Sequence, residues 1–60
     1  SRVMKVGDYI TEKDYDILEY QIVYIQETNR QAKDYCVRDT SGSSLMIIRE
    51  PSIFNYKVIT

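Results

Sequence analysis

Stiff, β-branched side chains dominate this chain. The sequence holds eight isoleucines and five valines against two leucines and one alanine, and six tyrosines accompany them. β-branched and aromatic side chains lose rotamer freedom in a helix and pack well on a pleated sheet. A helical domain of this length would depend largely on leucine and alanine. The composition therefore predicts an all-β fold.

The length of the chain limits the size of its core. Sixty residues suffice for one domain, and we expect residues 1–60 to form it. Such a domain buries only about 60% of the surface that its unfolded chain exposes, so its stability is marginal. A single cysteine, Cys36, permits no internal disulfide, and in a chain without histidine it cannot build a zinc site. The core must come from the apolar residues, or from a partner or second copy.

Cysteine usage and hydropathy also bear on the compartment. A lone cysteine without a disulfide framework indicates a reducing environment. No apolar run approaches the roughly 20 residues of a transmembrane helix, and no secretory signal pattern opens the sequence. We therefore expect a cytoplasmic protein without membrane contact.

Apolar runs separated by turn signals predict five short strands. The strands are expected over residues 6–10, 20–27 and 33–39, over a fourth stretch that ends at Arg49 or Glu50, and over residues 56–60. Residues 11–16 are polar and are expected to form a loop, after which residues 14–20 form either one helical turn or more loop. Residues 27–31 are expected to form a polar turn. Pro51 cannot donate to a ladder, so it ends the fourth strand, and residues 51–55 suffice for one 3₁₀ turn.

The strongest turn signal is Asp39-Thr40-Ser41-Gly42. It predicts a three-residue loop closed by Asp39 and Ser43, with Gly42 at the left-handed bulge position. In that register Val37 faces Leu45 and Tyr35 faces Ile47, while Cys36 faces Met46. One face of this hairpin is then expected in the core (Tyr35, Val37, Leu45, Ile47), and the other is half-exposed (Cys36, Met46, Ile48).

This order of elements resembles a small SH3-like barrel. The valine-glycine entry at residues 6–10, the stretch 19–23, the hairpin 34–42 and the segment 47–58 carry the resemblance. The chain resembles small SH3-like proteins of phages and prophages of Gram-positive bacteria. The resemblance implies a five-stranded SH3-like barrel with a short 3₁₀ turn before the last strand. It implies no activity, because fold and function separate readily. Polyproline recognition is not expected either, since the tryptophan of eukaryotic SH3 grooves is missing.

No pattern in the sequence indicates catalysis. Cys36 has no histidine to activate it as a nucleophile. The carboxylates Glu12, Asp14 and Asp16 lack the spacing and the glycine of a calcium loop. With only two glycines, the chain has no glycine-rich phosphate loop. We expect a protein that is not an enzyme and that holds no metal and no cofactor.

Charge is unevenly distributed along the chain. Residues 1–29 hold three basic and six acidic side chains, whereas residues 30–60 hold five basic and three acidic ones. The acidic stretch runs from Asp8 to Glu19, and the basic residues of the second half include Arg30, Lys33 and Arg38. The simplest interpretation is a solvated acidic loop facing solvated strands.

The tyrosines carry the first functional hypothesis. Tyrosine offers a large, stiff, amphipathic contact area and is favoured at binding surfaces. We expect a non-catalytic protein-interaction module, a small phage or mobile-element protein that docks on another protein. Its partner-binding surface is expected at Tyr9, Tyr15, Tyr20, Tyr56, Asp14 and Asp16, and a partner with a basic, apolar-centred patch would suit it. The alternative that these tyrosines only cover strand faces stays open.

Two further hypotheses use other residues. A single-stranded nucleic-acid binder would use Arg30, Lys33 and Arg38 for phosphates, with neighbouring aromatic rings for stacking. A homodimer would bury the half-exposed face of Cys36, Met46 and Ile48 against a second copy.

Overall fold

The structure is a computed structural model that describes residues 3–27 and 32–59. Within these residues five antiparallel strands form one sheet, and the helical structure amounts to a 3₁₀ turn. The elements are β1 (Tyr9–Glu12), β2 (Tyr15–Glu27), β3 (Lys33–Asp39), β4 (Leu45–Arg49), η2 (Ser52–Asn55) and β5 (Tyr56–Val58). The prediction of an all-β fold is confirmed, and so is the 3₁₀ turn before the last strand.

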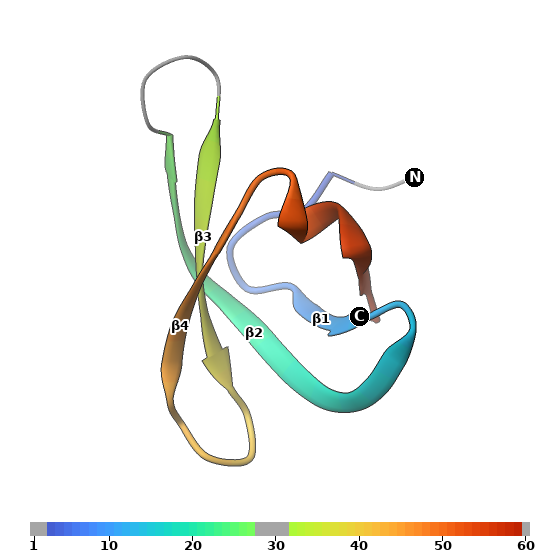
Figure 1. Cartoon of the computed structure of the whole chain (residues 1–60). Coiled ribbons are helices and arrows are strands. Elements are labelled where there is room, and N and C mark those ends of the chain that lie inside the picture. Colours follow the sequence, from blue (N-terminus) through green and yellow to red (C-terminus); the bar gives the residue numbers. More distant parts are fainter. Residues whose placement is uncertain (1–2, 28–31, 60) are drawn as a thin grey trace.

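The long strand β2 organises the sheet, whose order is β4-β3-β2-β1-β5. Its first half pairs with β1 and its second half pairs with β3. The register with β3 shifts between Ile22 and Tyr24, so Val23 forms a bulge. A bulge bends a strand and increases its twist. Figure 1 shows the result, a curved β2 that carries β1 and β5 at one end and the β3–β4 hairpin at the other.

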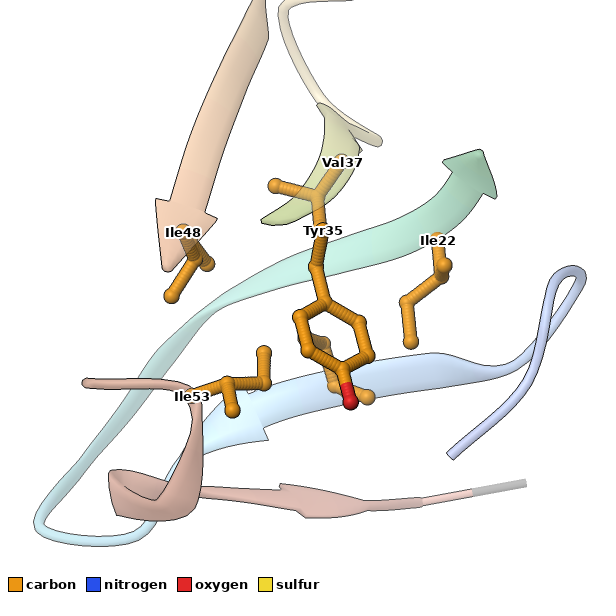
Figure 2. Packing of buried hydrophobic residues seen from close by; sticks show 6 residues of the cluster. Ile22, Tyr35, Val37, Ile48 and Ile53 are labelled. Carbon is orange, nitrogen blue, oxygen red and sulfur yellow. The ribbon is translucent and has the colours of Figure 1, made fainter. Parts of the chain in front are cut away.

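The core lies inside this bend. Figure 2 shows the side chains from separate elements pointing toward one another. Six hydrophobic residues are buried: Ile10, Ile22, Tyr35, Val37, Ile48 and Ile53. Four of the six are isoleucines, which agrees with the bias of the composition toward β-branched side chains. Met4, Tyr20, Ile25, Tyr56 and Val58 pack around them and remain half-buried.

The first strand begins later than the sequence predicts. Residues 5–8 form a turn, in which the Asp8 N–H donates to the Lys5 carbonyl at 3.0 Å. The buried Asp8 carboxylate closes the turn by accepting from the Lys5 N–H at 3.0 Å. Gly7 has a φ of +96°, a backbone conformation that residues other than glycine rarely adopt. The valine-glycine entry is therefore a turn, and pairing starts only at Tyr9.

The expected loop over residues 11–16, and the loop or helical turn after it, are wrong. Only Lys13 and Asp14 turn, and Tyr15 already belongs to β2. These polar residues form strands because β1 and β2 pair with each other, as Glu12 does with Tyr15. The Thr11 hydroxyl also donates to the Leu18 carbonyl at 2.7 Å and bridges the irregular part of the β1–β2 ladder. Tertiary pairing overrides local propensity here.

The predicted register of the β3–β4 hairpin is wrong by one residue. Asp39 pairs with Ser44 through a 2.8 Å bond from the Asp39 N–H, and the loop therefore has four residues. Ser43, with a φ of 64°, takes the left-handed position that was expected of Gly42. Because side chains alternate along a strand, a shift of one residue exchanges the two faces of β4. Ile48 is consequently buried opposite Tyr35, whereas Leu45 and Ile47 are exposed.

The Asp39 side chain explains why the longer loop forms. Its carboxylate accepts from the Ser41 N–H and the Ser41 hydroxyl, each at 2.9 Å, and from the Gly42 N–H at 3.4 Å. These bonds from Ser41 and then Gly42 lower the pKa of Asp39. An aspartate at the start of a turn is suited to this role, since its oxygen reaches the backbone two residues on.

The remaining elements follow the sequence closely. β4 ends at Arg49, before a cis Glu50–Pro51 peptide bond. The 3₁₀ turn η2 then buries Ile53 and leaves Phe54 exposed. The last strand covers residues 56–58, and the Ile59 N–H continues its pairing by donating to the Tyr9 carbonyl at 2.8 Å. The polar turn expected over residues 27–31 lies largely outside the described residues.

Candidate functional site

Two of the tyrosines singled out by the sequence lie in contact. The rings of Tyr20 and Tyr56 meet edge to face, with centroids 6.2 Å apart and planes inclined by 69°. Strand β1 brings them together, because Ile10 pairs with Tyr20 on β2 and Glu12 pairs with Tyr56 on β5. Both rings are half-buried against the core. Burial, then the charge of Glu12 and the neighbouring Tyr20, raise the pKa of Tyr56.

Tyr9 is the first residue of β1, whereas Tyr15 on β2 pairs with Glu12 at the other end of β1. Glu12 pairs with Tyr15 on one side and with Tyr56 on the other, so these three residues form a row across the sheet. Tyr15 is exposed at the start of β2. Tyr9 pairs with Gln21 at the other end of β1 and is half-buried. The structure thus brings Tyr15, Tyr20 and Tyr56 to one region and leaves Tyr9 apart from them.

The two candidate aspartates border the same region. Asp14 lies in the turn between β1 and β2, and Asp16 follows on β2, where it is exposed. The neighbouring Lys13 N–H donates to the Asn55 carbonyl at 2.8 Å. This bond joins the β1–β2 turn, to which Asp14 belongs, to η2.

A pocket of about 310 Å³ opens between the N-terminal segment, the β1–β2 turn and η2. Ligand pockets begin at about this size. Its lining is mostly apolar and consists of Val3, Met4, Lys13, Tyr35, Ile53, Phe54 and Tyr56. Phe54 is 60% exposed at its rim, which is an uncommon position for the one phenylalanine of the chain. The pocket can accept an apolar side chain from outside.

Tyr35 lines this pocket, and its hydroxyl has a partner of its own. It donates to a Glu50 carboxylate oxygen at 3.5 Å, and the other oxygen of that carboxylate accepts from the Lys33 N–H at 3.1 Å. Burial, and then the charge and hydrogen bond of Glu50, raise the pKa of Tyr35. The phenol therefore stays neutral and acts as a hydrogen-bond donor.

Of the basic residues proposed for nucleic acid, Arg38 and Lys33 lie in the described part of the chain. Arg38 donates to the Gln21 side-chain oxygen at 2.7 Å. Lys33 lies 3.9 Å from the Glu27 carboxylate. Arg30 falls outside the described residues. Arg38 and Lys33 thus each have a partner in the chain.

The described residues also bear on other kinds of site. They hold no group of three or more potential metal-ligating side chains. Cys36 is a free, half-buried thiol on β3, across the sheet from the pocket. Over residues 3–27 and 32–59 there is also no helix long and apolar enough to span a membrane.

Sequence reasoning missed most of the pocket lining. Met4, Ile53 and Phe54 carry no chemistry by themselves, and only the fold brings them beside Tyr56. One available signal was the adjacency of Ile53 and Phe54, because a single 3₁₀ turn cannot bury two large neighbours on the same side. Comparison of the chain with protein-family models, curated proteins and solved structures finds no match.

Proposed function

We propose that this protein is a non-catalytic protein-interaction module that binds an apolar side chain of its partner in the pocket beside η2. The observation that carries the proposal is the exposed Phe54 ring at the rim of an apolar pocket, next to Tyr56. A half-open apolar pocket with a few polar groups is the usual form of a recognition site. An aromatic side chain at its rim is a typical anchor of binding energy.

The charges around the pocket favour a particular kind of partner segment. Glu12, Asp14 and Asp16 lie in and next to the β1–β2 turn, whereas Lys13 is the one basic side chain of the lining. Within residues 12–16, three acidic side chains outnumber Lys13, so we expect this turn to attract a segment with basic residues flanking an apolar anchor. Complementary charge increases the rate of encounter and the specificity more than the affinity.

We propose further that the fold is an SH3-like barrel and that the protein comes from a phage or another mobile element. The bent strand β2, the tight β3–β4 hairpin and the 3₁₀ turn before β5 support the assignment of the fold. The origin depends only on the sequence resemblance. A cytoplasmic location agrees with the free thiol of Cys36.

The test compares two exposed aromatic residues. Peptide ligands are selected from a displayed random library on the immobilised protein, and their affinities are measured for Phe54→Ala and Tyr24→Ala. The two side chains are 60% and 57% exposed, but only Phe54 lines the pocket. We expect Phe54→Ala to weaken binding by about 10-fold or more, as loss of an anchor does. Tyr24→Ala serves as the matched control and should bind normally.

A second comparison tests the charges. Reversal of both aspartates, Asp14→Lys with Asp16→Lys, should slow association and remove its dependence on salt. Selection of no ligand, or equal losses for Phe54→Ala and Tyr24→Ala, would overturn the proposed site. Tyr20→Ala is unsuited to this purpose, because Tyr20 packs against the core and its loss would disturb the fold.

A further inference from the structure

Strand β4 is an edge of the sheet with an apolar, exposed surface. It is the terminal strand in the order β4-β3-β2-β1-β5. Leu45 is 65% exposed and Ile47 is 57% exposed, and between them Met46 is 39% exposed. Natural sheets usually protect such an edge with charges, prolines or bulges, because an open edge is a template for another strand.

The phase of the β3–β4 ladder identifies the backbone groups at this edge. The Glu50 N–H donates to the Lys33 carbonyl at 3.0 Å, and the Asp39 N–H donates to the Ser44 carbonyl at 2.8 Å. Hydrogen-bonded pairs alternate along an antiparallel ladder. The even-numbered residues of β4 therefore bond to β3. The N–H and C=O groups of Leu45, Ile47 and Arg49 point away from β3, toward the edge.

The charged side chains near this edge are held by their own chain. The Arg49 guanidinium donates to the Asp34 carboxylate at 2.8 Å. That ion pair raises the pKa of Arg49. The Glu50 carboxylate folds back onto β3 and accepts from the Lys33 N–H and the Tyr35 hydroxyl. Over residues 45–50 the charge of Arg49 is thus compensated by Asp34, and the Glu50 carboxylate is held against β3 by two neutral donors.

We propose that β4 pairs with β4 of a second copy of this chain, antiparallel and with Ile47 at the two-fold axis. Ser43, with its φ of 64°, and Pro51 limit the extended segment to the residues between them. With Ile47 opposite Ile47, all three outward-facing residues of each copy find a partner, since Leu45 then lies opposite Arg49. No other symmetric register engages all three. Isologous pairing of this kind is the commonest way to form a dimer.

The side chains on the outer face suit this arrangement. Tyr24, Cys36 and Ile47 lie in one row across β2, β3 and β4. In the dimer this row continues through the axis into the same row of the second copy, so that the two Ile47 side chains cover each other. Arg49, already paired with Asp34, lays its aliphatic stem against the Leu45 of the second copy.

The small size of the contact predicts a weak dimer. Five residues on each side bury less than the roughly 1,200 Å² of a standard stable interface. We expect association only at high protein concentration, with a dissociation constant above about 10 μM.

Cysteine cross-linking tests the register. In the Cys36→Ser background, Ile47→Cys places two thiols on hydrogen-bonded partners, whose Cα atoms are about 5.5 Å apart, within disulfide range. Leu45→Cys is the matched control, because its two copies are then about 13 Å apart along the strands. Mild oxidation should give a covalent dimer of Ile47→Cys and little of Leu45→Cys. Equal yields, or a dimer of Leu45→Cys alone, would overturn the proposed pairing.

Sedimentation velocity tests the dimer without oxidation. The protein should associate as its concentration rises toward the millimolar range. Ile47→Lys, which opposes two ammonium groups at the axis, should stay monomeric with an unchanged circular dichroism spectrum. Ile17→Lys changes a 73% exposed isoleucine on β2 and should still associate. A strict monomer, or equal effects of both lysines, would contradict the proposal. Ile47→Lys leaves the pocket intact, so this outcome is independent of the proposed function.

Discussion

The two edge strands of the sheet, β4 and β5, differ in how readily each could pair with a strand of another chain. β5 has three residues, and its half-buried Tyr56 and Val58 are drawn into the core while Lys57 is exposed between them. β4 has five residues, and its central Ile47 faces solvent. A short edge strand with a lysine resists pairing with another chain, whereas a longer apolar one invites it. An apolar composition alone therefore does not decide which side chains a small sheet can cover.

The largest expected effect concerns the element that joins the two edges. Ile53 of η2 is fully buried, and its neighbour Phe54 is 60% exposed. Ile53→Ala should lower the free energy of unfolding by about 2–5 kcal/mol, since it leaves a cavity in a small core. Phe54→Ala should cost less than about 1 kcal/mol. Urea denaturation of both variants would measure the contrast, and equal losses would show that η2 does not anchor the edges.

A direct comparison of the edges follows. Tyr56→Ala removes a half-buried ring and its edge-to-face contact with Tyr20, and should cost about 2–3 kcal/mol. Ile47→Ala on β4 should change the stability of the dilute monomer by less than about 0.5 kcal/mol. A double-mutant cycle of Tyr20→Ala with Tyr56→Ala should give a coupling of about 0.5–1.5 kcal/mol. A costlier Ile47→Ala would reverse the comparison.

Alkaline pH should weaken the β5 edge and the pocket together. The pKa values of Tyr35 and Tyr56 are raised above the ordinary value of 10.0. A raised pKa means that the folded protein binds the phenolic proton more tightly than the unfolded chain. The stabilisation is complete below pH 10 and is lost as the pH rises through the folded pKa values. Tyr35→Phe with Tyr56→Phe should flatten the decline of the urea midpoint above pH 10, and an unchanged slope would contradict this account.

The smallest effect concerns the hairpin that sets the register of β4. Ser43→Gly relieves a side chain held at positive φ and should stabilise the protein by up to about 1 kcal/mol. Gly42→Ala meets no atom within 4 Å and should be tolerated. Thermal melts of the two variants would measure this difference. If Gly42→Ala destabilises and Ser43→Gly has no effect, the hairpin instead has the register that places Ile47 in the core.

The hairpin also marks the limit of prediction from the sequence. The extent of β3, the end of β4 before Pro51 and the 3₁₀ turn were predicted correctly, because proline and alternating apolar residues have strong local effects. The length of the β3–β4 loop was not predicted correctly, because Asp39 can close a loop of either three or four residues. The difference of one residue in loop length decides whether Ile47 or Ile48 is buried in the core.

The candidate site was predictable to a smaller degree. Tyr15 and Tyr56 were identified as surface candidates, and they lie in one row through Glu12. Tyr20 was named with them, and both Tyr20 and Tyr56 pack against the core, whereas Tyr15 is exposed. Tyr35 was expected in the core, where it is found, but it also lines the pocket. A tyrosine has an apolar ring and a polar end, so its type alone cannot decide which part meets solvent.

The composition is enough to show that this chain is built of strands, since its β-branched and aromatic side chains are stiff in a helix and fit a pleated surface. The sequence also locates the hairpin and the 3₁₀ turn. The tertiary structure alone decided that polar residues 11–16 lie mostly in strands, which face of β4 is buried, and that Phe54 borders a pocket. These outcomes depend on partners distant in the sequence, and a shift of one residue in their pairing exchanges the inside of a strand with its outside.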